Sequence, residues 1–196
     1  MTKQDLANLD FVAGRADMVG LSFVRGAEDV LILHKELEGS HDTGIVLKIE
    51  NRQAFENLPR LLLAGLQCPP LGIMVARGDL AVELGFERLA EVQEEILWLC
   101  EAAHVPVVWA TQVLETLAKT GQPSRAEVSD ASMGVTAECV MLNKGPHIVE
   151  AVHFLDNILR RMQLHHHKKR SLLRGLSVSE MAPDAPRGQA VTVGEK

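Results

Sequence analysis

Two short segments of the chain place charged side chains where apolar runs end. Lys48 and Glu50 close one such run, and Arg77 and Asp79 follow another. Alternate residues of a strand point to the same side, so Lys48 and Glu50 are expected on one face. Charged side chains next to each other at the end of a buried strand cost free energy unless an opposite charge compensates them. The pattern predicts a site for a metal ion or an anionic ligand; a simple ion pair at the strand end is the structural alternative.

The elements that must position these side chains form a repeating pattern. Apolar, β-branched segments predict strands at 17–23, 44–50, 71–77, 105–111 and 138–143. Helical patterns lie at 26–38, 52–65, 87–103, 112–119, 124–136 and 147–170. Strand starts roughly 27 to 34 residues apart are typical of strand–helix units around a parallel sheet. The predicted fold class is therefore α/β.

Polar side chains gather at the carboxyl ends of the predicted strands. The set comprises Ser22, Arg25, Lys48, Glu50, Asn51, Arg77, Asp79, Thr111, Gln112, Asn143 and Lys144. A β/α barrel and an open doubly wound sheet both gather ligand-binding residues at this edge. The pattern therefore locates a site without separating the two folds. Ser124 and Glu127 match a capping box, which predicts a helix start between them.

Composition narrows the class of protein. The chain has 196 residues, 46% of them apolar, and a net charge of −6, which gives no reason to expect a nucleic-acid partner. Cys68, Cys100 and Cys139 are widely spaced and form no CxxC pair, so reduced and mostly buried thiols are predicted. No apolar run approaches the roughly 20 residues that span a bilayer, and no hydrophobic stretch near the N-terminus suits secretion. These features predict a cytoplasmic protein without a membrane partner.

Five segments together resemble the pyruvate kinase family, in that family's order and spacing. They are ADMVGLSFVR at 16–25, KIEN at 48–51, GIMVARGDL at 72–80, PVVWATQVLETL at 106–117 and PSRAEVSDA at 123–131. The resemblance covers residues 3 to 165 and implies a partial (β/α)8 TIM barrel, strands four to eight. Residues 1–165 are thus expected to form the barrel region. Residues 166–196 are expected to form a basic helix end and a disordered tail rich in Pro, Gly, Ser and Ala.

The resemblance implies a phosphotransferase of glycolysis that converts phosphoenolpyruvate and ADP to pyruvate and ATP. Lys48 would point at the moving phosphoryl group, and Thr111 would act near a proton path to the enolate carbon. Glu50 and Asp79 would hold Mg²⁺ or Mn²⁺, since hard cations take a few carboxylates and fill other positions with water and substrate. The implied substrate-binding residues are Lys48, Arg77, Gly78, Asp79 and Thr111. The family's K⁺ ligands lie outside this chain.

Other uses of these residues stay open. Asp79 suits a helix N-cap, and Thr111 with Gln112 suits the cap of the next helix. Glu127 fits its capping box, and Arg77 can brace the rim through an ion pair in place of touching substrate. Two departures from the family affect the site. Ala81 stands where the family has glycine, and Asn143-Lys-Gly-Pro146 replaces a Ser-Gly-Glu-Thr loop near the nucleotide.

A five-stranded part of a barrel leaves two open edges and one uncovered face. Such a sheet is expected to associate, as a homo-oligomer or with a missing N-terminal half. A different class of function is a non-catalytic barrel fragment that retains divalent-metal and small-anion binding. A third keeps the site but changes the reaction, to metal-dependent chemistry on pyruvate or oxaloacetate enolates.

Overall fold

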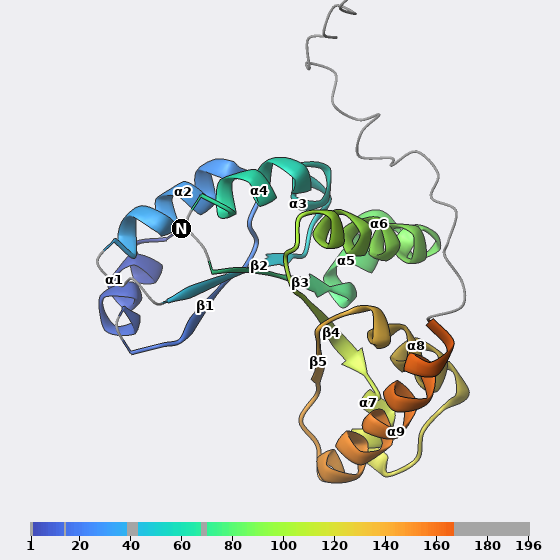
Figure 1. Ribbon diagram of the computed structural model, residues 1–196. Helices are drawn as coiled ribbons and strands as arrows, with labels where there is room; N and C mark the ends of the chain where they lie inside the picture. The colour runs from blue at the N-terminus through green and yellow to red at the C-terminus, as the bar shows by residue number, and fades with distance from the viewer. Residues whose placement is uncertain (1, 14, 39–42, 68–69, 167–196) are drawn as a thin grey trace, which may run out of the picture.

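The sheet consists of five parallel strands in chain order. The computed structural model describes residues 2–13, 15–38, 43–67 and 70–166 (Figure 1). The strands are β1 (Met18–Leu21), β2 (Gly44–Ile49), β3 (Leu71–Ala76), β4 (Val107–Val113) and β5 (Cys139–Leu142). Each pairs in parallel with the next, in the order β1-β2-β3-β4-β5. The α/β class and the five strand–helix units are confirmed, and the sheet does not close into a full barrel.

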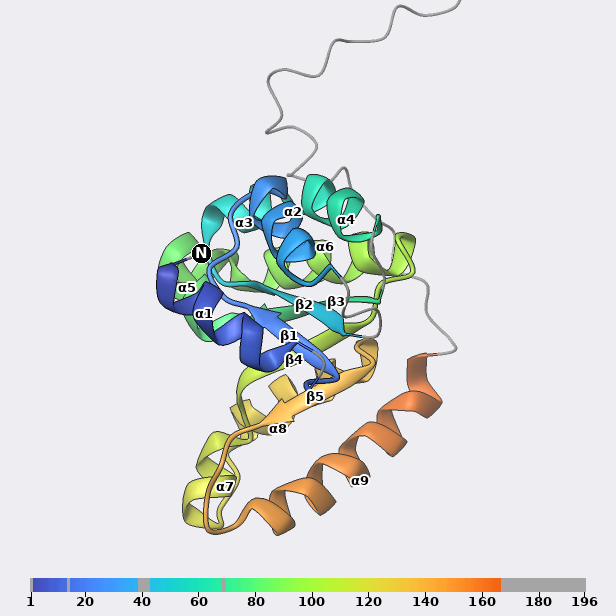
Figure 2. The same ribbon diagram turned by 90° about the vertical axis from the view of Figure 1, so that its left-hand side faces the viewer.

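Helices connect the strands and cover one face of the sheet (Figures 1 and 2). They are α1 (Lys3–Val12), α2 (Ala27–Glu36), α3 (Arg52–Glu56), α4 (Leu58–Gly65), α5 (Arg77–Leu84), α6 (Leu89–Ala102), α7 (Glu115–Thr120), α8 (Arg125–Met133) and α9 (Ile148–His166), with 3₁₀ turns η1 (Phe86–Arg88) and η2 (Gly134–Thr136). No helix within the described ranges is both long and apolar enough to cross a membrane.

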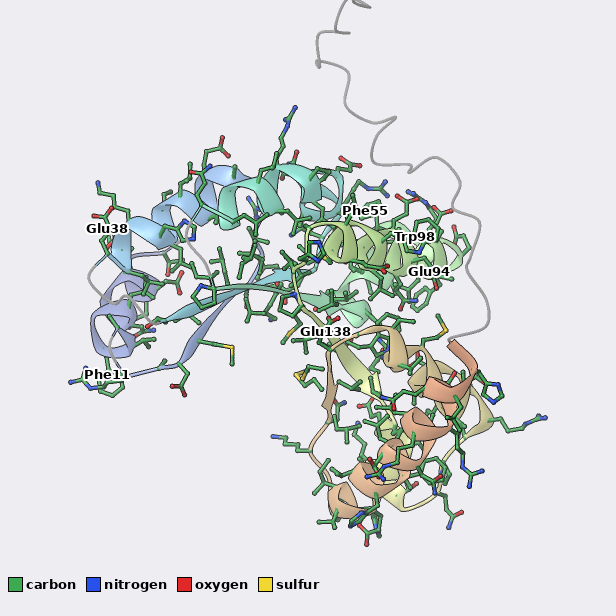
Figure 3. All side chains as sticks on the ribbon, in the orientation of Figure 1. Phe11, Glu38, Phe55, Glu94, Trp98 and Glu138 are labelled. Atoms are coloured by element: carbon green, nitrogen blue, oxygen red, sulfur yellow. The ribbon has the colours of Figure 1, made fainter. Side chains whose placement is uncertain are left out.

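The hydrophobic core lies between the sheet and these helices. On β2, Ile45, Leu47 and Ile49 are buried and point toward the helical side. Figure 3 shows Phe55 and Trp98 among the helices of the same side. Because side chains alternate along a strand, residues 46, 48 and 50 point the other way. The core therefore fixes which side chains of β2 reach the opposite, concave face.

The concave face of the sheet is open. Met18 on β1 is 67% exposed, and Met141 and Cys139 on β5 are also exposed. In both edge strands exposed residues alternate with half-buried ones. Apolar side chains in water and unpaired strand edges both favour association with another chain or segment.

Several predicted boundaries were wrong for local reasons. The strand predicted to reach 77 ends at 76, because Arg77 begins α5, a helix that the sequence reading missed together with α1. The helix predicted over 52–65 breaks at Asn57, just before Pro59, whose ring lacks an N–H and does not continue a helix from the preceding turn.

The segment after β4 also differs from the prediction. A helix was predicted from residue 112, but β4 continues to Val113 and α7 starts at Glu115. Thr111, Gln112 and Leu114 have positive φ angles, so the backbone here is irregular. The predicted helix at 147–170 is found over 148–166, and residues 167–196 lie outside the described part of the chain, as does Cys68.

The two described cysteines, Cys100 on α6 and Cys139 on β5, differ in burial. Cys100 is buried, and burial, with a smaller contribution from the Glu138 carboxylate, raises the pKa of its thiol to about 12. Cys139 is exposed on β5. In a Cys68→Ser background, we expect iodoacetamide at neutral pH to label Cys139 and to reach Cys100 only after unfolding. Rapid labelling of both thiols in the folded chain, measured by mass spectrometry, would contradict this arrangement.

Candidate active site at the carboxyl ends of the strands

Lys48 and Glu50 meet at the carboxyl end of β2. The Lys48 Nζ lies 2.6 Å from Glu50 Oε1, and it also donates a hydrogen bond to Ser22 Oγ at 3.0 Å. The lysine side chain is 28% exposed, whereas that of the glutamate is 3% exposed. The two predicted site residues therefore form an ion pair whose cation faces outward and whose anion is buried.

The second oxygen of Glu50 is held by the backbone of the neighbouring strand connection. Phe23 donates its backbone N–H to Glu50 Oε2 at 2.6 Å. Phe23 has a φ of 52°, a left-handed conformation that is unfavourable for a bulky residue. This conformation turns the amide toward the carboxylate while 64% of the phenylalanine stays exposed. Opposite charge and a backbone donor together compensate the buried anion.

Asp79 shares a cavity with Glu50. The cavity has a volume of about 450 Å³ and lies between the segments after β1 and β2 and the helix α5. Its lining residues are Phe23, Arg25, Glu50, Asn51, Arg52, Gln53, Glu56, Asp79, Val82 and Glu83. Asp79 occupies the first turn of α5 and is not the residue that precedes this helix, which is Ala76. The structure thus brings Glu50 and Asp79 to one cavity.

The donor set of this cavity fits a hard divalent cation. Mg²⁺ binds through one or two carboxylates and leaves its other positions to water and substrate oxygens. Glu50 and Asp79, which line this cavity, are the two carboxylates that could take this role. Among the described residues no group of three or more His, Cys, Asp or Glu side chains is arranged to hold a metal by itself. The arrangement therefore suits an open, substrate-completed site and not a closed structural one.

Thr111 and Gly78 form a second contact at this edge. The Gly78 backbone N–H donates to Thr111 Oγ1 at 2.9 Å, and Thr111 has a φ of 65°. Two residues predicted to bind substrate, which are 33 positions apart in the chain, are thus in direct contact. The hydroxyl lies where α5 begins, next to the backbone that is expected to receive a carboxylate.

Arg77 lies just below the rim, the edge of the sheet that the carboxyl ends of the strands form. Its guanidinium points into the protein interior. It is 5% exposed and donates from Nε to the Ala110 carbonyl at 2.9 Å. Its other two nitrogens contact the Thr111 carbonyl and the Asp130 carboxylate. The guanidinium carbon also lies 4.6 Å from the centre of the Trp109 ring. These contacts support the bracing role for Arg77 rather than a direct substrate contact.

Glu127 forms the predicted capping box of α8. Ser124 Oγ accepts from the Glu127 N–H at 3.2 Å, and Glu127 Oε2 accepts from the Ser124 N–H at 3.0 Å. Its other oxygen accepts from the Thr116 N–H of α7. Burial raises the pKa of Glu127, but the hydrogen bonds from Ser124 and Thr116 outweigh it and hold the pKa below its ordinary value. The carboxylate thus joins two helices.

The segment between β5 and α9, which contains Asn143 to Pro146, packs against α7. His147 donates its backbone N–H to the Ala118 carbonyl at 3.0 Å. A Cβ placed on Gly145 would lie 2.1 Å from that same carbonyl oxygen, so only glycine fits there. Lys144 in the same segment is exposed. The segment is held by backbone contacts and offers one lysine to solvent.

The sequence did not predict that the segment after β1 contributes to this site. Ser22 was left without a role, and Phe23 was not considered. The residue types do not predict that Phe23 adopts a left-handed conformation. The contact of Ser22 with Lys48 forms only when β1 and β2 pair. The position of Ser22 at the carboxyl end of a predicted strand was the one available signal.

Comparisons with known proteins identify the family to which this chain is similar. The family model described as "Pyruvate kinase, barrel domain" matches residues 1–151. Similar curated proteins include pyruvate kinase of Candida albicans, 38% identical over 165 residues, and pyruvate kinase 1 of Trypanosoma brucei brucei, 39% identical over 166 residues. These matches cover 80% and 81% of this chain and 32% of each relative. The chain thus spans about a third of the length of the curated relatives it matches.

The bracing role of Arg77 predicts a large loss of stability on substitution. Arg77→Met keeps much of the side-chain volume but leaves the Asp130 carboxylate and two carbonyls without their donor. We expect the free energy of unfolding in urea to fall by about 2–4 kcal/mol. Arg88→Met removes an exposed i,i+3 ion pair and should cost less than about 1 kcal/mol. Equal losses in the two variants would argue against the bracing role.

The capping role of Glu127 predicts a pH-dependent contribution to stability. Because the folded-state pKa is lowered, the carboxylate stabilises the fold fully above its ordinary value of 4.5 and loses this effect as pH falls through the folded pKa. We expect wild type to be more stable than Glu127→Gln at pH 7 and the difference to shrink below pH 4.5. Urea unfolding of both proteins across this range measures it. A difference that is independent of pH would contradict the assignment.

Proposed function

This chain belongs to the pyruvate kinase family, and from that premise we propose that it carries part of a phosphotransferase site for phosphoenolpyruvate and ADP. The observation that carries the proposal is the ion pair between Lys48 and Glu50, with Asp79 lining the same cavity. In the proposed reaction the bond between phosphorus and the enol oxygen breaks, and a bond from phosphorus to ADP forms. The enolate then takes a proton at carbon to give pyruvate, as the final step of glycolysis.

In this proposal Lys48 neutralises the phosphoryl group during transfer. Such reactions depend on positioning and on stabilising the charge of the equatorial oxygens. Lys48 is suited to this because its ammonium is partly exposed at the strand end and is fixed by two neighbours, Glu50 and Ser22. A fixed cation needs little reorganisation when the charge on the phosphoryl group shifts.

Glu50 and Asp79 would hold a divalent cation, Mg²⁺ or Mn²⁺, which when bound neutralises charge on phosphoryl and enolate oxygens. Glu50 is prepared for this by burial and by its contact with the Phe23 amide, which keeps one oxygen in place. Asp79 approaches from the first turn of α5. K⁺ is proposed as a second cation, with ligands outside this chain.

The backbone around Gly78 would receive the substrate carboxylate, and Thr111 would assist the protonation of the enolate. The backbone around Gly78 opens α5, where amide groups favour an anion. The Thr111 hydroxyl already contacts the Gly78 amide and lies beside the position proposed for substrate. As a weak acid, a threonine hydroxyl is better suited to ordering a water that protonates the enolate than to donating its own proton.

Association is part of the proposal. The sheet has open edges at β1 and β5, and its concave face exposes side chains such as Met18. Further strands that complete the barrel would cover both. We propose that such strands come from a segment that carries the remaining strands of the barrel or from another copy of the chain. The same open face favours the second candidate function, a non-catalytic fragment that binds a divalent cation and a small anion. The cytoplasm is the proposed compartment.

The direct test is pyruvate formation from phosphoenolpyruvate and ADP with Mg²⁺ and K⁺. We expect Lys48→Met to lower turnover at least about 100-fold, because it removes a preorganised charge at the phosphoryl group. Lys35→Met makes the same substitution at an exposed position on α2 and should leave turnover unchanged. A folded wild-type chain without turnover would favour the non-catalytic candidate. Turnover that survives in Lys48→Met would contradict the role of this lysine.

A further inference from the structure

Ser22 lies against Lys48 from the neighbouring strand. It follows β1 directly, and its Oγ accepts a hydrogen bond from Lys48 Nζ at 3.0 Å. The stem of Lys48 passes beside Gly20, where a Cβ would meet the lysine Cδ at 3.9 Å. Gly20 and Ser22 are two residues apart and so share a face. The Lys48 side chain therefore extends over the end of β1, and its ammonium group lies next to the Ser22 hydroxyl.

The ammonium has one donor more than its two protein acceptors. A lysine ammonium carries three N–H groups. One contacts Glu50 Oε1 at 2.6 Å and one contacts Ser22. Among the described residues no third hydrogen-bond acceptor for Lys48 is found, and the side chain is 28% exposed. The remaining N–H is thus available to an anion at the rim.

The two acceptors respond differently to a bound cation. Glu50 is charged and is a proposed ligand of that cation, so its attraction for Lys48 weakens when the cation draws on its charge. The cation also repels the ammonium. Ser22 is neutral and does not contact the carboxylates of Glu50 or Asp79 in this structure. Its hydrogen bond to Lys48 does not depend on the charge of Glu50, so we expect it to persist when the cation binds.

We propose that Ser22 is a positioning residue that keeps the Lys48 ammonium at the rim when Glu50 is shared with a divalent cation. The inference rests on the proposed function, because it assigns Glu50 to the cation and Lys48 to the substrate anion. Through the adjacent Phe23 amide, the same segment holds Glu50. One short connection after β1 therefore sets the positions of both charges.

The test compares wild type with Ser22→Ala, Ser22→Thr and Lys48→Met. Binding of inorganic phosphate in the presence of Mn²⁺ is measured by calorimetry, and binding of Mn²⁺ alone by electron paramagnetic resonance. We expect Ser22→Ala to weaken phosphate binding about five- to tenfold, the loss of one hydrogen bond to a charged group, and to leave Mn²⁺ affinity within about twofold. Ser22→Thr retains the hydroxyl and should restore phosphate binding. Equal weakening in both serine variants would overturn the proposal.

A second measurement does not depend on phosphate binding. The Lys48 ammonium is followed by ¹⁵N NMR with Mg²⁺ present, and its signal is assigned by its loss in Lys48→Met. We expect a slowly exchanging signal in wild type and Ser22→Thr that is lost in Ser22→Ala. An unchanged signal in Ser22→Ala would overturn the proposal. If wild type binds no phosphate but the signal depends on Ser22, the proposed function fails and the positioning role stands.

Discussion

A nearly buried carboxylate is the constraint on which the rim of this sheet depends. Glu50 is 3% exposed, so its charge is tolerated only with nearby compensation. The Lys48 ammonium supplies the opposite charge and the Phe23 amide supplies a second donor. The contact with the Phe23 amide requires β1 and β2 to be paired in their observed register, whereas the ion pair with Lys48 forms within the end of β2. The position of the acid thus couples the charge at the rim to the folding of the strands below it.

The two faces of the sheet perform different tasks. Packing of Ile45, Leu47 and Ile49 against the helices fixes the direction of Lys48 and Glu50 through strand alternation. Arg77, which follows β3, stabilises the neighbouring strands below the rim. Its guanidinium donates to two backbone carbonyls of β4 and to one carboxylate of α8. The concave face has no such cover within the described residues. The chain therefore combines a rim held by several contacts with an open sheet face, and this open face favours association with further strands.

The sequence predicted the strands, their parallel class and the edge that carries the polar residues, because apolar periodicity and strand-end position are local properties. It also predicted the capping box at Ser124, whose two partners lie three residues apart. The positive φ of Phe23, the early start of α5 and the irregular end of β4 could not be predicted in this way. Each is imposed by contacts between distant segments, such as that of Thr111 with Gly78. The family resemblance supplied residue roles that spacing alone left open.

We propose above all that Glu50 and Asp79 act together as the protein ligands of one divalent cation. Titration of the folded chain with Mn²⁺, followed by electron paramagnetic resonance, tests it most directly when Glu50→Gln and Asp79→Asn are measured beside wild type. We expect one Mn²⁺ site per chain in wild type and an affinity at least about tenfold weaker in either variant. Mn²⁺ binding that is absent from a folded wild type, or unchanged in both variants, would contradict it.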